Sequence, residues 1–134
     1  MTAATQGRNT KRRSGERVGH IVNPGSTIHA GTLVALLTAN GNAVPAGTAG
    51  AGNAVGVAEE SVVGNGSALV DTWRGAAFLF ANSAAADAVA RADIGANAFV
   101  ADDQTVAKTD NSAARKVAGK IIDVDASGVW VVVG

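Results

Sequence analysis

Cysteine and tyrosine are absent from this chain of 134 residues, which also has only two tryptophans, three phenylalanines and one methionine. Without cysteine there is no disulfide framework, no thiolate nucleophile and no cysteine-ligated metal. Aromatic residues make up 4% of a chain that is 47% apolar, because most apolar residues are alanine and valine. We therefore expect a thin core built from small side chains.

Long hydrophobic runs are also lacking. No apolar stretch approaches the ~20 residues that a membrane helix needs. The N-terminus is polar and then basic, so no secretory signal is recognisable. We expect a soluble protein, synthesised in a cytoplasm, with no membrane partner.

Charge is unevenly distributed along the chain, although the formal net charge is zero. Residues 1–17 have five basic residues and one acidic residue, a net charge of +4, and the rest of the chain has six basic and ten acidic residues, a net charge of −4. The basic residues of this first segment are Arg8, Lys11, Arg12, Arg13 and Arg17. Because the segment has almost no apolar content, we predict a flexible basic arm over residues 1–17 and a β-rich domain over residues 18–134.

Short Val/Leu/Ile-rich runs alternate with Gly/Asn/Ser/Asp clusters from Val18 onward, and this pattern is typical of an all-β domain. We predict a small barrel or sandwich of short strands with at most one short helix. The predicted strands are 17–22, 32–38, 54–62, 67–71, 76–80, 98–101, 117–124 and 129–133. Residues 41–53 are predicted to form a loop, and residues 125–128 a hairpin turn.

The segment "NSAAADAVARADIG", residues 82–95, leaves two alternatives open. Asn82 or Ser83 could cap a short alanine-rich helix that ends at Gly95. The segment could equally be a loop rich in turns.

Two halves of the domain show a faint internal repeat. Val44 to Val55 spans eleven residues, as does Val106 to Val117. Each interval lies between a strand that follows a glycine turn and a second, valine-rich strand. Two related β-units packed face to face would explain the pattern, and chance similarity in a chain rich in Ala, Val and Gly is the alternative.

No catalytic constellation, cofactor motif or metal-ligand spacing is recognisable. His20 and His29 lack an acidic or histidine partner at metal-ligand spacing. Asp102 and Asp103 are expected in a solvated turn, and Asp123 and Asp125 share one face of a strand, as a cation site or as a polar strand end. The glycine-rich loops lack the lysine and hydroxyl residue of a phosphate cradle. We therefore expect no catalytic, cofactor-binding or metal-binding residues, and a protein that is not an enzyme.

The stretch "NPGSTIHAGTLV", residues 23–34, resembles the hairpin of biotinyl and lipoyl carrier domains, but no lysine lies in a carrier-type turn. Of the two tryptophans, Trp130 in "GVWVVVG" is expected in the core. Trp73 follows a predicted strand and precedes Arg74, so it is either a core residue or an interface anchor.

The order of "AGTLVAL", "NAVGVAEE", "ALVDTWRGAAFLFANS", "DIGANAFVADDQTVAKTD" and "VAGKIIDVDASGVWVVV" resembles the capsid cement, or head decoration, proteins of tailed bacteriophages. The resemblance covers roughly residues 18–134. It implies a structural protein without turnover that binds the outer surface of a virion capsid and cements the shell, often as a homotrimer. Its partners would be the major capsid protein and further copies of itself.

The resemblance and the residues together give a set of expected contacts. The arm cations would bind the capsid, and Trp73, Arg74 and Phe78 are candidate interface residues. Two alternatives remain: a nucleic-acid-binding module that acts through the arm, which the acidic body and the scarcity of aromatic residues disfavour, and another virion component such as a fibre or spike base.

Overall fold

The computed structural model describes residues 2–134, and its secondary structure is almost entirely β. The predicted fold class is confirmed, including a closed five-stranded barrel. The strands are β1 (Arg17–Ile21), β2 (Thr27–Ile28), β3 (Leu33–Leu37), β4 (Ala43–Pro45), β5 (Ala51–Ala58), β6 (Val62–Val63), β7 (Leu69–Trp73), β8 (Ala77–Asn82), β9 (Asn97–Val100), β10 (Thr105–Ala107), β11 (Val117–Asp125) and β12 (Gly128–Val132).

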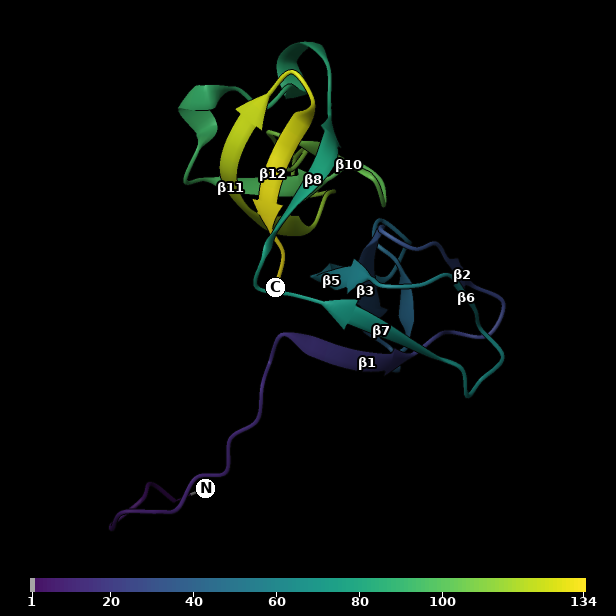
Figure 1. The fold of residues 1–134 in the computed structure, drawn as a ribbon, viewed down its shortest axis with the longest axis vertical. Helices are drawn as coiled ribbons and strands as arrows, with labels where there is room; N and C mark the ends of the chain where they lie inside the picture. Colours follow the sequence, from purple (N-terminus) through teal and green to yellow (C-terminus); the bar gives the residue numbers. More distant parts are fainter. Residues whose placement is uncertain (1) are drawn as a thin grey trace.

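The strands form two halves (Figure 1), and the hydrogen-bonded strand order is the same in both. The first half, residues 17–73, contains a sheet ordered β1-β7-β5-β3-β4, and a parallel bridge from Val22 to Ala43 leads from β4 back to β1. The second half, residues 77–132, is the closed barrel β8-β12-β11-β9-β10, which closes through a parallel pairing that includes Val106 and Asn82. Each strand of the five-stranded sheet in the first half therefore has a counterpart in the barrel of the second half.

Individual backbone hydrogen bonds repeat from one half to the other. Gly31 N donates to Ala58 O at 2.8 Å in the first half, and Gly95 N donates to Ile121 O at 2.9 Å in the second. Both halves also have a register irregularity at the same place. It lies between β3 and the long strand β5 in the first half, and between β9 and the long strand β11 in the second. The two halves are one β-unit used twice.

Gly56 and Gly119 are counterparts in this repeat, and each is required by a close approach. A Cβ at Gly56 would lie 2.9 Å from Trp73 O, and a Cβ at Gly119 would overlap Val132 O. Trp73 and Val132 are themselves counterparts, because they pair with Val57 and Lys120, one residue beyond each glycine.

The predicted repeat was correct in kind and wrong by one residue in register. The pairings align Ala43 with Val106 and Ala54 with Val117, whereas the sequence pattern aligned the valines of both halves. Valine and alanine exchange freely on small-residue strands, so matching residue types does not identify the register.

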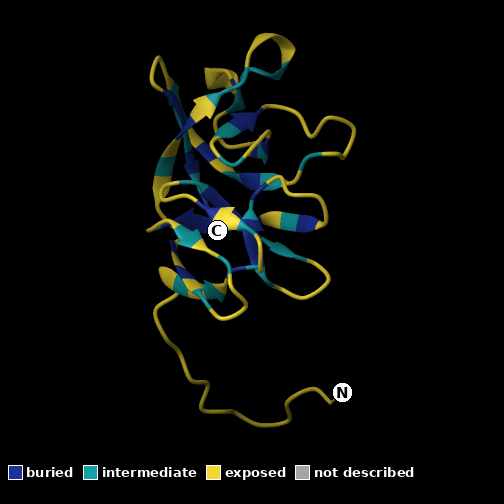
Figure 2. Ribbon diagram, turned by 90° about the vertical axis from the view of Figure 1, so that its right-hand side faces the viewer, coloured by how far each residue is buried: buried dark blue, intermediate teal, exposed yellow. Residues whose placement is uncertain are grey.

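The two halves share one hydrophobic core. Buried residues lie at the centre of the body in Figure 2. The larger buried cluster joins residues of the first half, such as Leu33 and Val57, to residues of the second, such as Phe80 and Val131. Leu33 N also donates to Asp103 O across the halves at 2.8 Å. A smaller cluster around Val34 and Val70 belongs to the first half alone.

Residues 82–95 form two separate 3₁₀ turns, Ala85–Asp87 and Arg91–Asp93, so the turn-rich alternative describes this segment. The side chain of Asn82, a candidate helix cap, instead bonds both the N–H and the carbonyl of Val89, at 2.8 and 2.9 Å. Val89 is buried in the shared core. Holding this one apolar residue in the core keeps the chain between the turns extended.

All eight predicted strands are present, with ends shifted by up to four residues. The short strands β2, β4, β6 and β10 were missed, and β4 with Pro45 lies inside the predicted loop 41–53. Pro45 is tolerated because β4 is the last strand of its sheet in hydrogen-bonding order. The predicted hairpin turn is present between β11 and β12, where Ser127 N donates to Asp125 Oδ1.

Candidate functional site

Residues 2–16 form an extended, fully exposed chain that leaves the body at the start of β1 (Figures 1 and 2). The four cations Arg8, Lys11, Arg12 and Arg13 make no ion pair within residues 2–134. Their charges are therefore available to another molecule. The flexibility of the arm stays a prediction.

Arg17, predicted both as the last cation of the arm and as the start of a strand, is the first residue of β1. Its Nη2 lies 2.8 Å from Glu59 Oε2 and 3.9 Å from Asp71 Oδ2. The hydrogen bond to Glu59 and the charge of that carboxylate raise the pKa of Arg17. The charge of Arg17 is thus balanced inside the body, and the arm ends at Glu16.

The candidate interface residues Trp73, Arg74 and Phe78 lie together where the first half joins the second. Trp73 ends β7, on the outward face of the strand, and is 51% exposed. It is therefore not a core residue. Together with Glu16 and Arg17, these residues line a groove of about 470 Å³ at the root of the arm.

A second groove, of about 330 Å³, shares Trp73 and Phe78 with the first. Its other lining residues include Gly31, Val57 and Glu59. The two aromatic side chains therefore form a wall between two grooves, which we call the Trp73–Phe78 wall. Phe78 also packs against the shared core, and this packing holds its side chain in place.

Arg74 links the arm root to the C-terminal end of the described chain. Its Nη2 donates to Gly134 O at 2.6 Å, and its backbone N–H donates to Glu16 O at 2.9 Å. Gly75 N donates to Val133 O at 2.7 Å. No carboxylate side chain within residues 2–134 pairs with the guanidinium of Arg74.

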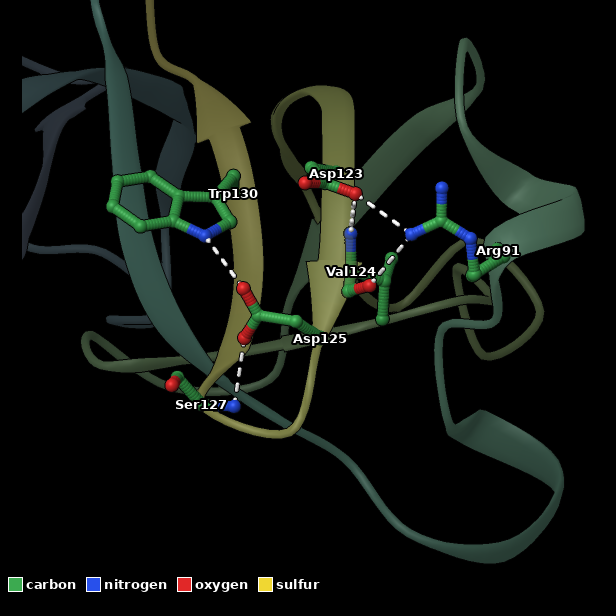
Figure 3. A network of polar contacts seen from close by, with 6 residues as sticks. All are labelled: Arg91, Asp123, Val124, Asp125, Ser127 and Trp130. Carbon is green, nitrogen blue, oxygen red and sulfur yellow. Dashed lines mark hydrogen bonds and ion pairs between the residues drawn. The ribbon is translucent and has the colours of Figure 1, made fainter.

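Asp123 and Asp125 are engaged by protein groups, as Figure 3 shows. Asp123 Oδ1 accepts hydrogen bonds from Arg91 and from the backbone of Val124, both at 2.9 Å, and these interactions lower the pKa of Asp123. These contacts are those expected of a polar strand end. Asp125 has different partners, because it accepts hydrogen bonds from Ser127 N at 2.7 Å and from the indole N–H of Trp130 at 3.3 Å.

Trp130 is half-buried on the outer side of β12 rather than part of the core, which corrects the sequence expectation. Its indole N–H donates to Asp125 Oδ2 at 3.3 Å. Strand alternation explains the position, because the neighbouring Val129 and Val131 point into the barrel.

The remaining polar candidates are dispersed. His20 is half-buried beside Val18, and its burial lowers its pKa, whereas His29 is exposed. Asp102 lies in the turn between β9 and β10, where it accepts the N–H of Gln104. Among residues 2–134, no three His, Cys, Asp or Glu side chains gather closely enough to hold a metal ion. In the same range there is no helix that is long and apolar enough to cross a membrane.

Comparison with protein-family models, with curated proteins and with solved structures finds no match for this chain.

Proposed function

We propose that this chain is a structural virion protein that binds the outer surface of a tailed-phage capsid, holds the major capsid protein in the assembled shell and carries out no chemical turnover. The observation that carries the proposal is the separation of charge: four unpaired cations lie on an exposed arm, and the β body keeps its own cations paired or scattered.

The arm suits binding to a repetitive acidic surface. Fifteen residues of extended chain reach about 50 Å, so one copy could contact positions well outside its own footprint. Self-association as a homotrimer would multiply such weak contacts through effective concentration. We place the protein on the virion exterior, after synthesis in the host cytoplasm.

The test is sedimentation of the protein with expanded capsids of the virus from which the chain comes, followed by measurement of bound copies per particle. Deleting residues 2–13 should sharply lower occupancy. Charge reversal at Arg12 and Arg13 should do the same, with the larger loss at low salt. The matched control reverses Lys116 and Lys120, which are exposed, form no ion pair in the described chain and lie on the second half. Full decoration by the arm-deleted protein across a salt titration would refute the arm as a cementing element.

A nucleic-acid-binding module is the second candidate, because an exposed tryptophan beside an arginine at the root of a basic arm could stack on bases. Carboxylates of Glu16 and Glu59 line the two grooves and would repel phosphates. Binding of single- or double-stranded DNA by the arm at physiological salt, without binding to capsids, would favour this candidate.

A further inference from the structure

The internal repeat provides a control for the residues around the Trp73–Phe78 wall, because each position can be compared with its counterpart in a unit of the same fold. Trp73 pairs with Arg17 in β1, and its counterpart Val132 pairs with Ala77 in β8. The second half therefore has valine at the position that tryptophan occupies in the equivalent strand pair of the first half. The fold does not require tryptophan at position 73, and the 51% exposed Trp73 lies beside the half-buried Phe78 on the lining of two grooves.

The shape around Trp73 fits an extended chain rather than a flat surface. Grooves of about 470 and 330 Å³ lie on the two sides of the wall and share its aromatic side chains. An apolar side chain could lie against Trp73 or Phe78 while the backbone on either side of it follows the grooves. Aromatic and arginine residues in such positions are the usual energetic centres of protein interfaces.

The charges at the grooves identify the chemistry of the occupant. Arg17 is neutralised by Glu59 and Asp71, so it offers little net charge. Arg74 pairs with no carboxylate side chain in the described chain, although its Nη2 donates to Gly134 O at 2.6 Å. The first groove opens at the root of the arm, which has four unpaired cations. Acidic groups on the occupant would complement Arg74 and the arm. The carboxylates of Glu16 and Glu59 disfavour a continuous run of negative charge, so acidic groups of the occupant are expected only beside Arg74 and the arm and not along the whole of the grooves.

We propose that the grooves beside the Trp73–Phe78 wall bind an extended peptide segment of the partner in which an apolar side chain is flanked by acidic residues. The apolar side chain contacts Trp73, and the acidic residues pair with Arg74 and with the arm. This inference rests on the proposed function, since it names the chemistry of the shell segment that the protein holds.

The two tryptophans allow a direct test by NMR, because the protein has one indole signal in each half. The probe is a synthetic peptide with one leucine between two pairs of aspartates, titrated into the ¹⁵N-labelled protein at low salt. We expect a saturable shift of the Trp73 indole signal and no shift of the Trp130 signal, which reports on the hydrogen bond to Asp125. Comparison peptides replace the aspartates by lysine or the leucine by serine, and both should bind about tenfold more weakly or worse.

Variants of the protein separate the apolar contact from the charge contact. Trp73→Val installs the counterpart residue and should weaken peptide binding about tenfold, with Trp73→Phe in between. Arg74→Gln should weaken it by a similar factor. Lys120→Gln, the control, removes an exposed cation from the second half and should change nothing. A thermal melt of each variant verifies that the fold is kept.

Several results would overturn the inference: no shift of the Trp73 signal at millimolar peptide, equal binding of the lysine peptide, or equal shifts of both indole signals. Saturable binding of oligothymidylate at the Trp73 signal, in place of the acidic peptide, would also overturn it and favour nucleic acid. Capsid sedimentation distinguishes failure of the peptide-groove inference from failure of the proposed cement function. Capsids decorated equally by wild type and Trp73→Val would refute the groove alone, whereas undecorated capsids with intact peptide binding would refute the cement role alone.

Discussion

Leu33 lies where the two halves share their core, so its truncation to alanine tests whether they unfold together. The side chain is fully buried, and it belongs to the cluster that contains Val131 of the second half. Replacing a buried leucine by alanine typically costs about 3–5 kcal/mol from lost burial and the cavity left behind. This is a large part of the ~5–15 kcal/mol that stabilises a typical domain.

A cost of that size should lower the melting temperature by roughly 10–20 °C for a chain of this length. The assay is urea or thermal unfolding followed by the two indole NMR signals, since Trp73 reports on the first half and Trp130 on the second. We expect both signals of the Leu33→Ala variant to be lost in one transition, at the same lowered midpoint. Val63→Ala is the control, because Val63 is 66% exposed and its truncation should change stability by no more than about 0.5 kcal/mol.

The reasoning would be refuted by two separate transitions in which the Trp130 signal keeps its wild-type midpoint. In that case the buried cluster would be two adjacent cores that contribute independently, and the two halves would be separate domains.

Three further predictions concern the arm, a repeated glycine and an ion pair. Deleting residues 2–13 should leave the melting temperature unchanged, and the amides of those residues in the intact, isolated protein should be sharp and unprotected in NMR spectra; protected, dispersed amides would contradict this. Gly119→Ala should destabilise by about 1–3 kcal/mol in urea titrations, because its Cβ would overlap a carbonyl of the neighbouring strand, whereas Gly7→Ala in the open arm should be neutral. The folded-state pKa of Asp123 is lowered below its usual 3.8 by the hydrogen bond from Arg91, so its stabilising contribution is present above that value and is lost as pH falls through the lower folded pKa. Arg91→Gln should therefore flatten the acid limb of the stability profile, and an unchanged limb would exclude this pair as a contributor.

The sequence by itself determined the class of the fold and the separation of the charges. Alternation of Val/Leu/Ile runs with Gly, Asn and Asp depends on the two-residue period of a strand, which is a local property, so the strands and the hairpin turn after Asp125 were predictable. The exposed arm cations followed from the scarcity of apolar residues before Val18. The short strands β4 and β10 were missed because three residues leave almost no local pattern.

Only the tertiary structure decided how the repeat is registered, which face each tryptophan takes and what Arg17 binds. A shift of one residue reverses the face of every side chain in a strand, and the register depends on cross-strand hydrogen bonds that join residues far apart in the chain. Trp130 and Trp73 were therefore placed outward by the pairing of β12 and β7 with their neighbours. Arg17, which the sequence placed both in the arm and at the start of a strand, binds a carboxylate 42 residues away, Glu59. The grooves beside Trp73 have the same origin, because they are lined by residues that only the packing of β5, β7 and β8 brings together.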